Sequence, residues 1–136
     1  GVRAVWLVST ATFAGDEHKV ASPEFSVDLA GCGPRLFRIT LFALQRRTVF
    51  SFRDCGGLGR VELKCEEELP PGTGAVAVGV VVGAGERAQR QLVEHDFSRR
   101  RCCSVRGWAF REAANPGTWS LPVEVSLAFL APSVSP

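Results

Sequence analysis

The chain has 136 residues, enough for one domain that buries about two thirds of the surface its unfolded chain would expose. Hydrophobic residues make up 46% and charged residues 22%, which is ordinary for a globular protein. The formal net charge of +2 does not by itself indicate nucleic-acid binding, and no apolar run reaches the roughly 18 residues of a membrane-spanning helix. We therefore expect neither a nucleic-acid partner nor a membrane partner.

The apolar residues form short segments separated by turn signals, and no long stretch has a helical period. This pattern, with 14 glycines and 8 prolines, is typical of an all-β sandwich. We expect about eight strands in two antiparallel sheets, with Asp16–Ser22 as a polar turn and Arg46–Phe52 as a possible hairpin partner of the strand before it. The other predicted strands are Val2–Phe13, Phe25–Leu29, Leu36–Leu44, Arg60–Glu66, Ala75–Val82, Ala88–Phe97 and Val123–Leu130.

Alternation along these strands predicts which side chains share a face. The almost continuous apolar run of Ala75–Val82 predicts a central strand buried on both faces. The side chains expected to share a face within each of the other strands are Val2, Ala4, Trp6 and Val8; Phe37, Ile39 and Leu41; Val61, Leu63 and Cys65; and Val123, Val125, Leu127 and Phe129.

The segment Gly107-Trp108-Ala109-Phe110 places two large aromatic residues two positions apart, so both point to one face of an extended strand. One interpretation is an exposed aromatic shelf on which a partner docks. The other is that Trp108 and Phe110 fill the core, as large aromatic residues often do.

Five cysteines (Cys32, Cys55, Cys65, Cys102 and Cys103) form no CxxC pair, and only His18 and His95 could add nitrogen ligands. This spacing fits neither a zinc site nor a disulfide framework, so we expect no metal and a reducing, intracellular setting in the cytoplasm or nucleus. The arginines near Cys102 and Cys103 could lower a thiol pKa. No motif for nucleophilic or acid–base catalysis is present, and we expect neither an enzyme nor a cofactor.

Taken in order, these segments resemble the MATH (meprin and TRAF homology) domain, also called the TRAF-like domain. The matching features are Trp6 in the first strand, 20–25 (VASPEF), 59–65 (GRVELKC), 95–98 (HDFS) and 107–110 (GWAF). The segment Leu36-Phe37-Arg38 departs from the family pattern, which has a tryptophan there. We expect residues 1–131 to form the domain and residues 132–136 a tail or linker.

The resemblance implies a shallow groove that binds short, extended, often Ser/Thr-rich peptides and recruits clients to ubiquitin-ligase, deubiquitinase or signalling machinery. The family's groove positions fall on Trp108, Phe110, Arg60, His95 and Val76. Because Arg60 can pair with carboxylate or phosphate, the expected peptide is acidic or phosphorylated. Arg60 can equally be an ordinary solvent-facing strand residue.

The basic run Arg99, Arg100 and Arg101 follows the His95 segment and could attract an acidic partner. It could equally be a solvated loop in an arginine-rich chain. For the whole chain, the alternative to a peptide-binding domain is a structural or oligomerisation sandwich without a peptide groove.

Overall fold

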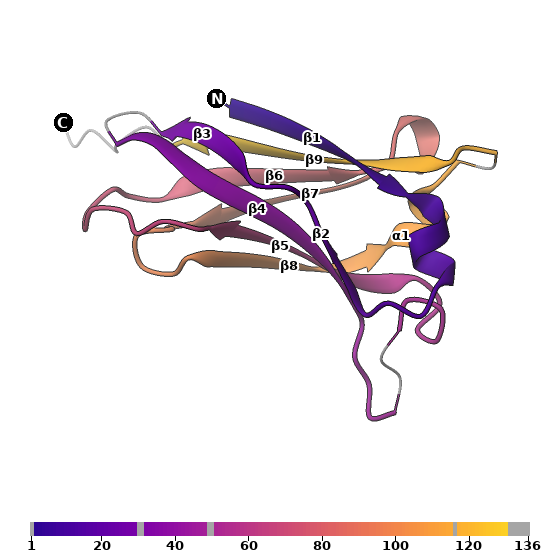
Figure 1. Cartoon of the computed structure of the whole chain (residues 1–136). Helices are drawn as coiled ribbons and strands as arrows, with labels where there is room; N and C mark the ends of the chain where they lie inside the picture. The colour runs from indigo at the N-terminus through magenta and orange to yellow at the C-terminus, as the bar shows by residue number, and fades with distance from the viewer. Residues whose placement is uncertain (1, 30–31, 49–50, 116, 131–136) are drawn as a thin grey trace.

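The computed structural model describes residues 2–29, 32–48, 51–115 and 117–130. Within these ranges the chain forms two antiparallel sheets packed against each other (Figure 1), which confirms the predicted all-β sandwich. Sheet A has the strand order β1-β9-β6-β7, and sheet B the order β2-β4-β5-β8 with β3 also paired to β4. The bounds in sheet A are β1 Val2–Ser9, β9 Ser120–Phe129, β6 Val76–Val82 and β7 Gln89–His95. Those in sheet B are β2 Lys19–Ala21, β3 Phe25–Leu29, β4 Gly33–Ala43, β5 Leu58–Cys65 and β8 Cys102–Ala109.

Three short helical turns complete the described chain: η1 Thr10–Ala14, η2 Gly85–Arg87 and α1 Phe110–Ala113. The first predicted strand therefore ends at Ser9, and η1 takes up the rest of it. This turn buries Phe13, whose ring packs edge-on against Phe52 with 5.3 Å between centroids. β1 is therefore shorter than the alternating pattern predicted, because the chain turns at η1 and buries the Phe13 ring.

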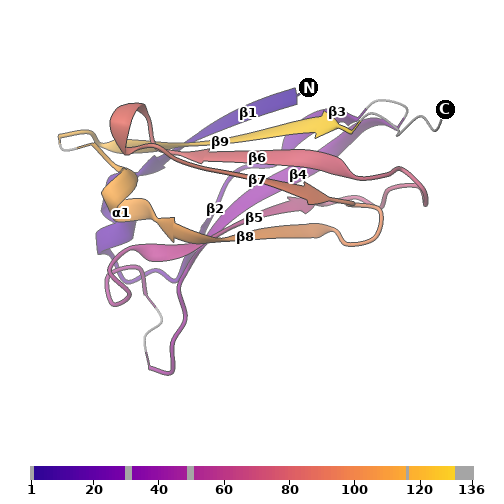
Figure 2. The same ribbon diagram turned by 180° about the vertical axis from the view of Figure 1, so that it is seen from behind.

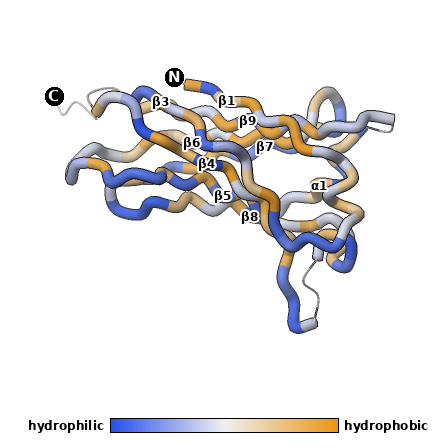
Figure 3. Tube along the Cα trace, viewed as in Figure 1, coloured by the Kyte–Doolittle hydropathy of each residue, from blue (hydrophilic) through white to orange (hydrophobic). Residues whose placement is uncertain are grey.

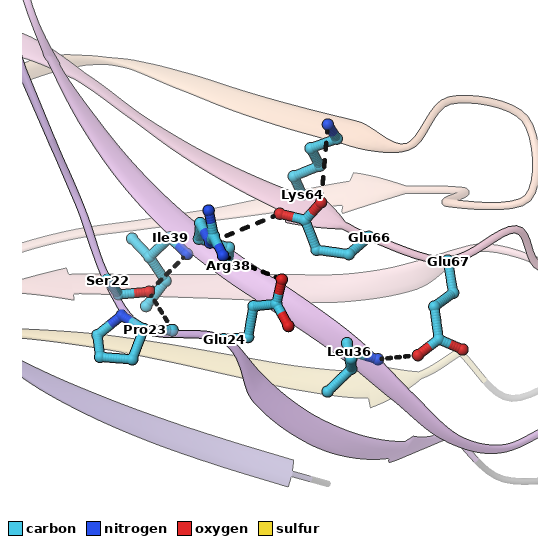
Figure 4. A network of polar contacts seen from close by, with 9 residues as sticks. All are labelled: Ser22, Pro23, Glu24, Leu36, Arg38, Ile39, Lys64, Glu66 and Glu67. Atoms are coloured by element: carbon cyan, nitrogen blue, oxygen red, sulfur yellow. Dashed lines mark hydrogen bonds and ion pairs between the residues drawn. The ribbon is translucent and has the colours of Figure 1, made fainter.

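The segment predicted as a turn, Asp16–Ser22, contains the short strand β2. The pairing of β2 with β4 ends at Ser22. The Oγ atom of Ser22 accepts a hydrogen bond from the N–H of Ile39 (3.0 Å) and donates one to the carbonyl of Pro23 (2.8 Å), as Figure 4 shows. The side-chain oxygen replaces a strand partner at the break between β2 and β3. On the opposite, outer face of β4, Arg38 binds Glu24 at 3.0 Å.

The described part of Arg46–Phe52 does not form the predicted hairpin strand. Beyond an isolated bridge at Arg46 it makes turns and a bend, and its last residue, Phe52, is fully buried. The N–H of Phe52 donates to the carbonyl of Glu17 at 2.9 Å, so this loop is anchored against the β1–β2 connection instead of β4. Residues 49–50 lie outside the described ranges, as do residues 131–136, which include the predicted tail.

Burial confirms the predicted inward faces of β4 and β5, and that of β9 up to Leu127, whereas Phe129 at the end of β9 is 39% exposed. The side chains at 1% exposure or less include Phe37, Ile39, Leu41, Val61, Leu63, Cys65 and Val123. The expectation that β6 is buried on both faces is wrong: its burial alternates between buried and half-buried residues. The half-buried residues face outward from sheet A, where the neighbouring β7 side chains Arg90, Leu92 and Glu94 are exposed.

The edge strands β7 and β8 lie along the same side of the sandwich, as Figure 2 shows. Side chains of β7 reach across to the β8 backbone. The side-chain amide of Gln89 donates through Nε2 to the carbonyl of Ala109 at 2.8 Å, and its Oε1 accepts from the N–H of Ala109 at 2.9 Å. Gln91 donates to the carbonyl of Arg106 at 2.7 Å. These bonds close part of the open edge of sheet B.

Candidate functional site

Trp108 and Phe110 are core residues, which confirms the second interpretation of their spacing and shows that the exposed aromatic shelf is wrong. Their exposed fractions are 1% and 0%. The indole Nε1–H of Trp108 donates to the carbonyl of Val105 at 2.9 Å, which satisfies the one polar group of the side chain. Phe110 begins α1 and stacks on Phe13 with 5.2 Å between ring centroids. Neither ring is available to a ligand.

A β-bulge near the end of β8 turns Trp108 inward. Between the pairs Val105–Val61 and Trp108–Gly59, β8 has one residue more than β5. Gly107, with φ of +88°, lies in this extra segment. Strict alternation from the buried Val105 would have pointed the side chain at 108 to solvent, and the additional residue reverses that direction. The bulge therefore directs the Trp108 side chain into the core instead of to the surface.

The remaining predicted groove residues do not share a surface. Val76 is 3% exposed and faces the core from β6, so it cannot line a groove. Arg60 lies on the outer face of β5 in sheet B, whereas His95 ends β7 in sheet A. The Nε2 atom of His95 lies 2.8 Å from the carbonyl oxygen of Arg100. The structure thus brings the five predicted positions to the core and to two different sheets.

Arg60 is held in one place on the outer face of sheet B. Its guanidinium carbon lies 3.9 Å from the centroid of the Phe42 ring, a cation–π distance. Its Nη1 atom donates to Glu62 and to the Ser104 hydroxyl, each at 3.1 Å. This side chain is about one third exposed, so one side of the guanidinium remains open to solvent.

A shallow groove of about 240 Å³ lies beside Arg60 on this face. Phe42, Arg60 and Arg106 line it together with the segment Ala43-Leu44-Gln45 and the glycines Gly59 and Gly107. Two guanidinium groups and one aromatic ring therefore line a hollow surface. Sequence reasoning found Arg60 and placed Arg106 in the basic cluster that follows Arg99–Arg101, but it missed Phe42. The alternation of Phe42 with the buried residues of β4 was the available signal.

The backbone of β8 has hydrogen-bonding groups that point to its free edge. The N–H of Cys65 donates to the carbonyl of Arg101 at 2.9 Å, which makes these two opposed residues a hydrogen-bonded pair. Because bonded and non-bonded pairs alternate in an antiparallel ladder, the N–H and C=O of Cys102 and Ser104 face away from β5. The stretch from 102 to 104 lies between the bonds that His95 makes at Arg100 and Gln91 makes at Arg106.

The basic run at the start of β8 is an exposed turn. The N–H groups of Arg99 and Arg100 both donate to the carbonyl of Asp96 at 3.1 Å. The side chains of Arg99, Arg100 and Arg101 are exposed and take part in none of the ion pairs found among the described residues. These three cations lie in the turn directly before β8, the strand that carries Arg106.

The expectation of an acidified thiol at Cys102 or Cys103 is wrong. Burial raises the pKa of the Cys103 thiol to about 11. At Cys102 partial burial is the main cause of a raised pKa, and the negative charge of Glu62 adds to it. Neither sulfur is therefore a thiolate at neutral pH, which is the form that reacts as a nucleophile.

Comparisons of the chain with models of known protein families, with curated proteins and with solved structures found no match. In the described ranges, no helix has the length and apolar content needed to cross a membrane. Nor do three His, Cys, Asp or Glu side chains gather there in a way that could hold a metal ion. The groove beside Arg60 and the adjoining β8 edge form the candidate site, because guanidinium groups, an aromatic ring and free backbone groups lie next to one another there.

Proposed function

We propose that this chain is a non-catalytic protein-interaction domain that binds a short extended peptide carrying an acidic or phosphorylated side chain. The observation that carries the proposal is the groove lined by Phe42, Arg60 and Arg106, next to a strand with free backbone groups. A guanidinium group binds carboxylate or phosphate through paired hydrogen bonds. Two such groups at one hollow favour an anionic side chain.

An added strand is the binding mode that the β8 edge supports. A peptide paired with Cys102 and Ser104 would gain main-chain hydrogen bonds that do not depend on its sequence. Its outward side chains would then lie beside Ser104 and Arg106 on the outer face of sheet B. The free stretch is short because β7 side chains bond the strand on either side, so the proposed peptide contributes few paired residues.

A role in recruiting clients to ubiquitin-ligase, deubiquitinase or signalling machinery follows from the resemblance to MATH domains. The proposal here differs from that resemblance in where the peptide contacts lie, because Trp108, Phe110 and Val76 are buried. All five cysteines are free thiols, and this supports an intracellular setting. The domain would act as an adaptor for acidic or phosphorylated motifs.

The test is fluorescence anisotropy with a library of acidic and phosphorylated Ser/Thr-rich peptides. Arg106→Glu should weaken binding of the best peptide by about tenfold or more, since it places a negative charge at the groove. Arg90→Glu is the matched control, because it makes the same charge change at an exposed position on the outer face of sheet A. Equal losses in both variants would refute a local site, as would a folded wild-type protein that binds no peptide.

A second pair of variants tests the strand edge separately from the charge. Ser104→Pro removes an N–H that faces the free edge and leaves the ladder to β5 in place, which an edge strand tolerates. Ser104→Ala removes only the hydroxyl and keeps that N–H. Loss of binding in the proline variant with binding kept in the alanine variant supports main-chain pairing. Equal affinity in both argues against it.

A further inference from the structure

Among the residues that the structure describes, β1 is an edge strand whose backbone has no partner along one side. It pairs with β9 from Val2 to Ser9, and sheet A ends with it. The N–H of Thr10 donates to the carbonyl of Trp119 at 3.0 Å, so this opposed pair is hydrogen-bonded. Since bonded and non-bonded pairs alternate, the even-numbered residues of β1 bond to β9. The odd-numbered residues therefore direct their N–H and C=O groups to the open edge.

Two of these odd-numbered residues carry exposed apolar side chains: Val5 is 55% exposed and Leu7 is 64% exposed. Three other residues of β1, Val2, Ala4 and Val8, are also small and apolar. Figure 3 shows β1 as mostly hydrophobic along its length. A long apolar edge strand is a template for pairing with another strand.

The other described edges of the two sheets are charged, partly closed or interrupted, and β1 is not protected in any of these ways. β7 carries the exposed charges Arg90 and Glu94 on either side of Leu92. β8 is closed at Ala109 and Arg106 by side chains of β7, so only a short stretch of its edge is free. The β2–β3 edge is divided at Pro23, between strands of three and five residues. β1 runs for eight residues with Arg3 as its one charge.

There is also room beside β1 for the side chains of an added strand. A hollow of about 240 Å³ separates β1 from the break between β2 and β3. Trp6 and Phe25 line it, so its walls are largely apolar. Inward-facing side chains of a strand added to β1 would enter this hollow.

We propose that β1 pairs antiparallel with β1 of a second copy of this chain, about a twofold axis at Val5. This register places Arg3 opposite Leu7 of the second copy, so like charges do not face each other. It also sets the small Ala4 opposite the large Trp6 on the inward face. The odd-numbered residues meet as hydrogen-bonded pairs, and the two A sheets become one continuous sheet. Such a contact uses the same patch on both copies, as twofold symmetry requires.

Sedimentation equilibrium from about 1 µM to about 1 mM protein tests this association. The wild-type mass should rise from monomer to dimer over this range. Val5→Pro should remain monomeric, because it removes two edge-directed N–H groups at the axis while sparing the bonds to β9. Leu92→Pro is the matched control: Leu92 is 75% exposed on the same outer face, at the far edge of sheet A. It should associate like the wild type.

Substitutions at Leu7 test the register without depending on a proline. Leu7→Glu places a carboxylate opposite Arg3 of the second copy, whereas Leu7→Lys places a like charge there. Because the pair occurs twice in the dimer, the glutamate variant should dimerise about tenfold more tightly than the lysine variant. A wild type that stays monomeric would overturn the proposal. So would association that survives Val5→Pro, that is lost in Leu92→Pro, or that is equal in the two Leu7 variants.

Discussion

Replacement of Trp108 by alanine is the substitution that most directly tests the observed core. The indole is 1% exposed and lies where β8 meets α1. Its Nε1–H is bonded to the carbonyl of Val105, so the substitution removes both a large apolar group and a hydrogen-bond donor. A groove residue would behave differently, because a surface tryptophan can be removed with little effect on folding.

The expected cost follows from the size of the buried ring. Truncation of a buried tryptophan to alanine costs about 3–5 kcal/mol, and loss of the indole hydrogen bond adds to the cost. For a chain of 136 residues, about 4 kcal/mol corresponds to a fall in Tm of roughly 14 °C. Peptide binding by Trp108→Ala would therefore fall because folded protein is lost.

Urea denaturation followed by far-ultraviolet circular dichroism measures this cost without relying on tryptophan emission. Trp119→Ala is the control, since Trp119 is 89% exposed and its removal should change stability by no more than about 0.5 kcal/mol. If both variants unfold at the wild-type midpoint, the assignment of Trp108 to the core is refuted.

Three further predictions follow from packing and ionisation. Gly59→Ala should destabilise the fold by about 1–3 kcal/mol in urea denaturation, because the added Cβ would overlap the Phe42 carbonyl; wild-type stability would contradict this clash. Cys103, with its pKa raised to about 11 by burial, should resist alkylation at pH 8 until the protein unfolds, and mass spectrometry showing native-state labelling would disprove this. The hydrogen bond from Ser98 lowers the pKa of Asp96, so this carboxylate contributes stability that is present above pH about 4 and is lost as pH falls through its folded-state pKa. Ser98→Ala should raise that pKa in a carboxyl NMR titration and weaken the acid dependence of stability, and an unchanged pKa would show that another contact is responsible.

Alternation was a sound guide wherever a strand has one buried face. Phe37, Ile39 and Leu41 alternate with half-buried residues in β4, and the sequence pattern predicted this burial directly. The strand at Phe25–Leu29 was predicted with the bounds that the structure has. In both strands a period of two reflects a single physical cause, burial of one face of a pleated sheet.

The same rule did not give the environment of the aromatic pair, because the backbone inserts a residue before it. Trp108 and Phe110 are both buried, although strict alternation from the buried Val105 would have pointed Trp108 to solvent. The bulge at Gly107 reverses that direction, and Phe110 begins α1. A glycine inside a strand is a recognised sign of a bulge, but its effect on the next side chain depends on which residues the neighbouring strand offers. Which strand lies next to the glycine is determined by the fold as a whole and cannot be deduced from the local sequence.

The candidate site was predicted only in part for a related reason. Arg60 was found, yet its partners in the groove come from β4 and β8, which are distant in sequence. His95 was grouped with it, although the two residues belong to different sheets. Periodicity predicts the face on which a side chain lies, whereas a site also requires the order of strands across the sheet.

Strand order also makes the two proposed contacts compatible. β1 lies at one edge of sheet A, and β7, which contacts β8, lies at the other. A dimer formed through β1 would therefore leave both β8 edges and both grooves open. Two sites held in one assembly would bind a client with two acidic motifs more tightly than one site can, while a single peptide would bind each copy independently. Val5→Pro should consequently reduce affinity for a two-motif peptide and leave the affinity for a one-motif peptide unchanged, whereas Arg106→Glu should reduce both.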